Sequence, residues 1–224
     1  MFKNFKLSVV AASIAVIAPT AFAQSAGSWT GSIGFTSLQP SVQSGALTAP
    51  SLPNTLSTSD SNTQPTGAVN YMYTDNIAVS VPLGFGFKNN ISGAGAIAGV
   101  GTIATTNSLP ISVLGQYRFM EAKASWRPYL GAGLTYVKFY NTTGTAALTS
   151  MTNPGSTTPT TISLQNKLTA TFQAGAVVNL SDKWYLDLNY TKTLLTTVGT
   201  LSTGQTQSIR LDPNGYTVGV GYKF

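Results

Sequence analysis

The strongest constraint in this sequence is a repeated alternation of apolar residues with small or polar residues. The clearest example is the run 77–88, in which one parity is apolar and the other is small or polar. The apolar parity of this run consists of Ile77, Val79, Val81, Leu83, Phe85 and Phe87. Alternation with period two is the pattern of a β-strand that has one apolar and one polar face. The sequence therefore predicts an all-β, antiparallel fold.

Eight such strands can be placed along the chain. Their predicted ranges are 26–38, 65–73, 77–88, 108–119, 127–140, 164–180, 184–195 and 207–224. Short connections at 74–76, 120–126 and 181–183 alternate with longer ones at 39–64, 89–107, 141–163 and 196–206. An even number of strands with short periplasmic turns and longer extracellular loops is typical of a transmembrane β-barrel. Closure is required because hydrocarbon offers no partner to an unpaired backbone group.

The polar faces of these strands carry Gly, Ser, Thr and Asn rather than charges. Charged residues make up 8% of the chain, whereas about 25% is usual in soluble domains. A soluble lipocalin-like barrel or β-sandwich is the alternative, but it would present charged faces to water. The composition therefore favours an eight-stranded antiparallel transmembrane β-barrel in the outer membrane of a Gram-negative bacterium.

Several kinds of chemistry are disfavoured by the residues that are missing. The chain contains no His and no Cys, which removes the usual catalytic base and thiolate metal ligands. Four acidic residues, Asp60, Asp75, Glu121 and Asp182, fall in different loops without metal-ligand spacing. The basic residues do not cluster as a nucleic-acid footprint would. We expect no enzyme activity, no cofactor and no nucleic-acid partner.

The N-terminal residues predict export. Lys3 and Lys6 precede an apolar run over 7–18, which is too short to span a bilayer as a helix. The small residues of Ala21-Phe22-Ala23 fit a signal-peptidase site. We therefore expect residues 1–23 to be a cleaved signal peptide and residues 24–224 to form the barrel.

The last predicted strand ends the chain with an aromatic residue. Its apolar parity is Tyr216, Val218, Val220, Tyr222 and Phe224. Earlier in the same run the apolar parity is odd, which predicts a β-bulge near 213–215. The terminal aromatics, Tyr222 and Phe224, resemble the signal by which the outer-membrane assembly machinery recognises its clients.

Strand parity assigns four charged residues to the lumen: Arg118, Asp187, Arg210 and Asp212. Buried charges need partners, so these residues are either structural groups that hold strand register or a polar constriction that excludes ions. Small residues at inward positions either leave room for a ligand or relieve crowding at strand bends. These are Gly84, Gly86, Gly131, Gly133, Gly219 and Gly221. The glycine-rich stretch 93–101 is interpreted as a flexible outer loop, because the strand-to-helix context and the lysine of a phosphate-binding loop are missing.

Four segments resemble the outer membrane protein W family, which includes alkane-uptake barrels. They are 71–79 (YMYTDNIAV), 127–134 (RPYLGAGL), 173–186 (QAG to DKWYL), and 210–213 (RLDP) ahead of 219–224 (GVGYKF). The resemblance implies an eight-stranded barrel with a narrow, partly apolar lumen. It also implies passage of small hydrophobic compounds across the outer membrane, with release sideways into the bilayer as one route. Some members of the family serve as bacteriocin receptors.

Two functions follow as hypotheses from the barrel and the resemblance. The first is passive uptake of small hydrophobic molecules through a narrow lumen. The alternative is a structural or receptor barrel whose outer loops bind a surface partner, a phage or a bacteriocin, without transport. The expected partners are outer-membrane lipids and lipopolysaccharide, small hydrophobic ligands and the outer-membrane assembly machinery. We expect a monomer.

Overall fold

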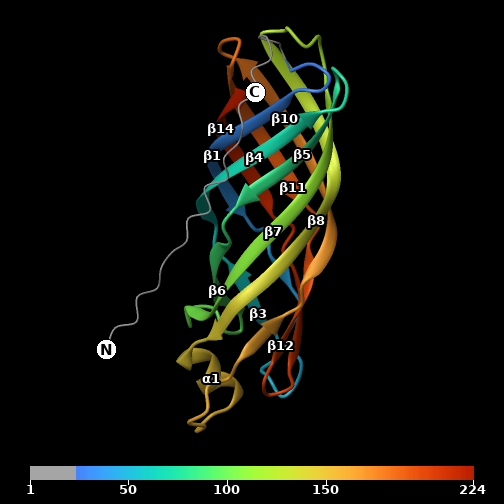
Figure 1. Ribbon diagram of the computed structural model, residues 1–224. Coiled ribbons are helices and arrows are strands. Elements are labelled where there is room, and N and C mark those ends of the chain that lie inside the picture. Colours follow the sequence, from blue (N-terminus) through green and yellow to red (C-terminus); the bar gives the residue numbers. More distant parts are fainter. Residues whose placement is uncertain (1–23) are drawn as a thin grey trace, which may run out of the picture.

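Eight antiparallel strands close into a barrel in the computed structural model, which describes residues 24–224 (Figure 1). In order around the barrel they are β1 (Trp29–Gln39), β4 (Asn62–Met72), β5 (Ile77–Gly84), β7 (Thr102–Arg118), β8 (Trp126–Gly144), β10 (Lys167–Asn179), β11 (Trp184–Thr193) and β14 (Asn214–Lys223). The barrel closes where β14 pairs with β1. The predicted fold class is confirmed. The predicted signal peptide, residues 1–23, lies outside the described residues.

Short strands extend the barrel at one end. Beyond the stretch that pairs with β5, β7 pairs with β6 (Phe87–Gly95), and β6 pairs in turn with β3 (Thr55–Ser59). A second sheet joins β2 (Gln43–Ser44), β13 (Thr206–Arg210), β12 (Thr196–Leu201) and β9 (Ile162–Leu164), and α1 (Ala146–Thr152) lies beside it. We call this the outer end, and the end with the short turns and Phe224 the inner end (Figure 1). The stretch 89–107, predicted to be a loop, belongs largely to β6 and β7. None of the helices within residues 24–224 has the length and apolar character needed to span a membrane.

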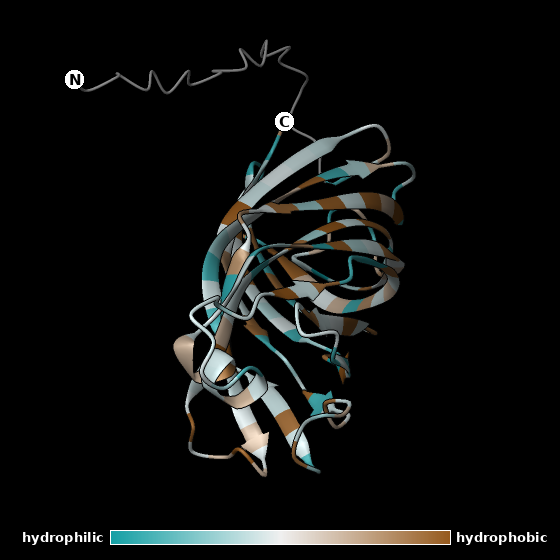
Figure 2. Ribbon diagram, turned by 90° about the horizontal axis from the view of Figure 1, so that it is seen from below, coloured by the Kyte–Doolittle hydropathy of each residue, from teal (hydrophilic) through white to brown (hydrophobic). Residues whose placement is uncertain are grey.

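In the barrel wall, apolar side chains point outward and polar side chains point inward. Ile33, Phe35 and Leu134 are exposed, while Asn70 and Gln173 are buried. Figure 2 shows apolar and polar residues alternating along the strands of the wall. A soluble protein buries its apolar face because water expels it. Here the exposed apolar face matches the hydrocarbon layer of a membrane.

The polarity reverses at the outer end, where apolar side chains point inward. A buried cluster forms there from Ile91, Ile97, Ile103, Ala104, Leu148, Leu164, Leu201 and Ile209. Phe87 is also buried, although it shares the sequence parity of the outward-facing Ile77. The parity changes because the predicted strand 77–88 breaks between β5 and β6. Side chains above the membrane meet water, so burial in a core becomes favourable again.

A second break replaces the predicted bulge near 213–215. Strand β13 ends at Arg210 and β14 begins at Asn214. Between them Asp212 has a left-handed backbone with φ of 33°. Ile209, before this break, faces the buried cluster, whereas Tyr216, after it, is exposed. The irregularity lies at 211–213, just before most of the predicted range, and it separates two strands rather than bulging one.

Aromatic side chains gather at the inner end. The ring pairs are Trp29–Tyr71 at 4.9 Å, Tyr117–Phe119 at 5.0 Å, Trp184–Tyr222 at 5.1 Å and Tyr222–Phe224 at 5.5 Å between centroids. Aromatic rings of this kind sit at the membrane–water interface of barrels. At the outer end, Phe87 is buried and Phe139 packs against the buried cluster, so neither belongs to an exposed aromatic girdle.

Candidate functional site

Three small cavities follow one another through the barrel. The outer cavity is about 130 Å³, the middle cavity about 70 Å³ and the inner cavity about 130 Å³. Ser57, Ile91 and Ile209 line both the outer and the middle cavity. Leu38, Pro110 and Thr193 line both the middle and the inner cavity. The cavities therefore form one series, with room for small molecules rather than for an open aqueous pore.

The outer two cavities are lined mainly by apolar side chains. Leu47, Leu56 and Ile97 contribute to the outer cavity, and Val42 and Leu195 to the middle one. These side chains come from the segments that form the outer sheet, the β3–β6 pair and their connections. The outer end therefore presents an apolar interior to anything that enters from the cell exterior.

A belt of hydroxyl groups lies around the inner cavity. Ser112 and Thr135 are 2.8 Å apart, Thr135 and Thr171 are 2.6 Å apart, and Thr171 and Thr193 are 2.9 Å apart, between oxygens. On the opposite wall, Thr36 makes hydroxyl contacts with Thr66 at 2.7 Å and Thr217 at 2.8 Å. The hydroxyl belt thus takes one residue from each of seven barrel strands: Thr36, Thr66, Ser112, Thr135, Thr171, Thr193 and Thr217. Because these groups bond to one another, they need no water.

Two buried arginines form the floor at the inner end. Arg118 Nη2 donates to Gln116 Oε1 at 2.9 Å, and Gln116 Nε2 donates to Gln173 Oε1 at 2.8 Å. Arg118 Nη1 also donates to Gln24 Oε1, and Arg127 Nη1 donates to the backbone oxygen of Gln24 at 2.9 Å. Within residues 24–224 neither guanidinium has a carboxylate at ion-pair distance. The floor is filled with side chains, so the lumen ends there.

Asp187 lies next to this floor but does not pair with Arg118 directly. The Tyr129 hydroxyl donates to Asp187 Oδ1 at 2.8 Å, and Asn189 Nδ2 donates to Oδ2 at 2.9 Å. Cζ of the Arg118 guanidinium lies over the Tyr129 ring, 5.7 Å from the ring centroid. Two of the four predicted lumen residues, Arg118 and Asp187, thus line the same inner cavity with Tyr129 between them.

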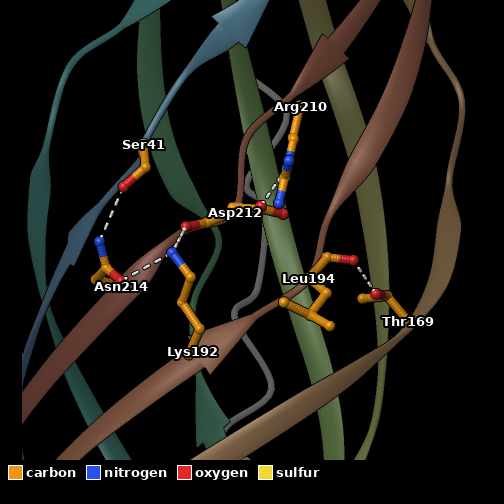
Figure 3. Close-up of polar contacts among 7 residues, drawn as sticks. All are labelled: Ser41, Thr169, Lys192, Leu194, Arg210, Asp212 and Asn214. Atoms are coloured by element: carbon orange, nitrogen blue, oxygen red, sulfur yellow. Dashed lines mark hydrogen bonds and ion pairs between the residues drawn. The ribbon is translucent and has the colours of Figure 1, made fainter.

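The other two predicted lumen residues lie elsewhere (Figure 3). Arg210 Nε contacts Asp212 Oδ2 at 2.5 Å, and Lys192 Nζ donates to the Asp212 carbonyl at 2.6 Å. The Arg210 side chain is 57% exposed, and neither Arg210 nor Asp212 lines any of the three cavities. The prediction for Arg210 is wrong. Ile209 points inward to the buried cluster at the outer end, and successive side chains of a strand point to opposite faces, so Arg210 points outward.

Sequence reasoning missed Arg127 and Gln24 as floor residues. Arg127 follows Trp126 at the start of a strand, and its parity matches that of Tyr129, which also points inward. That parity was the available signal for Arg127. No pattern in the sequence indicates that Gln24 lies beneath the barrel, because its position depends on how the chain enters β1.

Two inward glycines make room for neighbouring tyrosines. A Cβ on Gly221 would lie 2.0 Å from Cζ of Tyr185, and a Cβ on Gly175 would lie 2.5 Å from Cζ of Tyr129. Tyr185 is paired with Gly221 across β11 and β14, and Tyr129 with Gly175 across β8 and β10. At these positions the space is occupied by an aromatic ring rather than reserved for a ligand.

The wall beside the inner cavity is interrupted between β5 and β7. Pairing covers Ile77–Ser80 and resumes only at Phe87 on β6, opposite Ser108. The unpaired stretch of β7 contains Pro110, which has no backbone N–H to donate. Leu83 and Phe85, in the opposite unpaired stretch, line the inner cavity and are also 52% and 77% exposed. Side chains on both sides of this interruption, Pro110 and Leu83, therefore line the inner cavity.

Comparisons with known proteins agree with this architecture. The model of the OmpW family matches residues 25–224. Outer membrane protein W of Vibrio cholerae is 32% identical over 173 residues, covering 74% of this chain and 75% of that protein. Outer membrane protein AlkL of Ectopseudomonas oleovorans is 25% identical over 241 residues, covering 100% and 99%. The crystal structure of OprG from Pseudomonas aeruginosa superposes with a TM-score of 0.80 at 22% identity, covering 89% and 97%.

These relatives are outer-membrane proteins, so the predicted outer-membrane location is confirmed. The match to the family model spans every barrel strand, and the predicted family resemblance is confirmed with it. This chain belongs to the OmpW family of outer-membrane β-barrels.

Proposed function

We propose that this barrel is a non-catalytic channel for passive uptake of small hydrophobic molecules. A molecule enters the apolar outer cavity, passes the middle cavity and reaches the inner cavity. It then leaves sideways through the interruption between β5 and β7 into the membrane. The proposal is supported by the family resemblance and by the series of cavities that ends beside the interrupted wall.

The outer cavities favour hydrophobic solutes for an energetic reason. Transfer of apolar surface out of water is favourable by about 0.8 kcal/mol for each buried CH₂ group. Side chains such as Leu56, Ile97 and Leu195 offer such a solute an apolar lining. The cavity sizes, about 70 to 130 Å³, limit passage to one small molecule at a time.

The floor favours sideways release over passage into the periplasm. Arg118 and Arg127 are 2% and 0% exposed and occupy the inner end with their amide and carbonyl partners. A hydrophobic solute that displaced these groups would leave buried charges without hydrogen bonds, which is costly. By contrast, the interruption next to Leu83 and Phe85 leads to an apolar exterior. This interruption is the observation that carries the proposal.

A substitution that gives position 110 a backbone N–H tests the sideways route. We expect Pro110→Val to extend the β5–β7 pairing and to reduce uptake severalfold, because the exit narrows. The matched control is Pro128→Val, since Pro128 lies in the continuous pairing of β8 with β10. The measurement is uptake of a hydrophobic fluorophore by proteoliposomes that carry lipopolysaccharide in the outer leaflet.

Three results are informative in this assay. A loss of uptake in Pro110→Val but not in Pro128→Val supports sideways release. Equal uptake in both variants and the parent barrel excludes this exit. No uptake above that of empty vesicles by the parent barrel rejects transport and favours the receptor alternative.

A further inference from the structure

The first described residue, Gln24, is completely buried in the floor of the barrel. Its Oε1 accepts a hydrogen bond from Arg118, and its backbone oxygen accepts one from Arg127 at 2.9 Å. The next residues are also held in place. The backbone N–H of Ala26 donates to Asp75 Oδ1 at 2.8 Å, and that of Gly27 donates to the Met72 carbonyl at 2.8 Å. Residue 24 is therefore bound by its two oxygens in a site built by two arginines.

The side-chain nitrogen of Gln24 does not fit this site. Gln24 Nε2 is buried and has no hydrogen-bond partner in the described chain. A buried donor without a partner costs the desolvation free energy of that group. The site thus recognises the carbonyl oxygen of the amide and gives nothing to its nitrogen.

The charges around residue 24 also constrain the chain terminus. Cleavage after Ala23 would place an α-ammonium group on Gln24, beside the Arg118 and Arg127 guanidiniums. Like charges in a poorly hydrated region repel one another strongly. The Asp75 carboxylate is engaged by Ala26, and the Asp187 carboxylate by Tyr129 and Asn189. A neutral terminus at this position avoids the repulsion from the two guanidiniums.

We propose that the mature chain begins at residue 24 and that Gln24 occupies the two-arginine site as a pyroglutamyl residue. The deprotonated α-amine attacks Cδ of the side chain, and a new N–Cδ bond forms. The Cδ–Nε2 bond breaks, and ammonia leaves with the proton. No oxidant or reductant is needed.

This ring closure removes both the unpaired side-chain nitrogen and the charge of the terminus. It expels the nitrogen that has no partner, and it converts the charged terminus into a neutral lactam. Both oxygens that accept from Arg118 and Arg127 are retained. The proposal uses the predicted cleavage after Ala23 and is independent of the transport function.

The intact mass of the barrel, purified from outer membranes, tests the modification. We expect the mass of residues 24–224 less one molecule of ammonia, and an N-terminal peptide that carries the same loss. A mass equal to unmodified 24–224 would overturn ring closure and favour an α-ammonium paired with Asp75. A different first residue would overturn the whole proposal, including the cleavage position.

Enzymatic release of the pyroglutamyl residue tests whether the two-arginine site holds it. Pyroglutamyl aminopeptidase should remove residue 24 from the urea-unfolded chain but not from the folded barrel. In Arg127→Gln we expect release from the folded barrel to rise about tenfold or more, the change that about 1.4 kcal/mol makes to an equilibrium. If that variant does not assemble, Arg118→Lys replaces it, because lysine keeps the charge but not the planar fork.

The matched control is Lys183→Gln, which removes a positive charge from an exposed turn at the same end of the barrel. Release of residue 24 from the folded Lys183→Gln barrel should be as slow as from the folded parent barrel. Heat-dependent migration on gels reports that each variant is folded. Release from the folded parent barrel as fast as from the unfolded chain would reject the two-arginine site.

Discussion

At the residue scale, glycine decides whether the aromatic side chains of the inner end fit. We expect Gly221→Ala to destabilise the barrel by about 1–3 kcal/mol, the usual cost of overpacking. The new Cβ would overlap the ring of Tyr185, which is 1% exposed and cannot move into water. Reversible urea unfolding in lipid vesicles measures the free energy.

Gly115→Ala serves as the control for this change. A Cβ on Gly115 would meet only the carbonyl of Ala132, at 3.8 Å. Its free energy of unfolding should stay close to that of the parent barrel. Equal stability of Gly221→Ala and Gly115→Ala would contradict the packing of Tyr185 against Gly221.

The orientation of single residues was predictable from sequence in the strands whose apolar side chains all face lipid. Arg118 and Asp187 face the inner cavity because the wall strands keep apolar residues on the lipid side. The same rule failed for Arg210, since the surrounding medium changes from hydrocarbon to water between β14 and β13. Parity indicates which residues share a face, but it does not say which face is inward.

At the element scale, the outer end has a small core of its own. Leu148 of α1 is 4% exposed and belongs to the same cluster as Ile103 and Leu201. We expect Leu148→Ala to cost about 2–5 kcal/mol of local stability, as leucine truncations in cores do. Leu148 packs against the outer ends of β7 and β8, beyond the lipid-facing part of the wall, so barrel assembly should be unchanged.

Surface proteolysis of intact cells measures this local opening. Leu148→Ala should be cut faster near α1 than the parent, and Ser150→Ala, on the exposed side of the same helix, should not. Loss of the folded barrel in Leu148→Ala would show that the outer core and the wall fold as one unit.

Element positions were largely predictable because alternation is a local property. All eight wall strands fall within predicted ranges or overlap them, including 184–193 within 184–195. The breaks that divide 77–88 and 164–180 were not predicted. They depend on where neighbouring strands leave the membrane and meet water, which the local pattern does not record.

At the scale of the whole molecule, closure depends on the pairing of the last strand with the first. Deleting Phe224 should lower the yield of folded barrel in the outer membrane rather than change transport by the barrels that form. Phe224 donates its backbone N–H to the Trp29 carbonyl at 3.0 Å, and its ring packs against Tyr222. The role of Tyr222 and Phe224 as an assembly signal stays a prediction.

Quantification of heat-modifiable barrel in isolated outer membranes measures this yield. Phe172→Leu is the control, because Phe172 is an exposed aromatic in the middle of β10, away from the closing pair. Yield equal to that of the parent after deletion of Phe224 would count against the predicted signal.

The sequence by itself determined the class of fold, the number of wall strands, the compartment and which residues of a strand share a face. These follow from short-range alternation and composition, since a strand in hydrocarbon must keep an apolar face and a closed ladder. Only the tertiary structure decided which residues meet inside the barrel. The floor of Gln24, Arg118 and Arg127, and the interruption beside Pro110, join segments far apart in the chain. Their contacts arise from the register and curvature of the closed barrel, which no local pattern encodes.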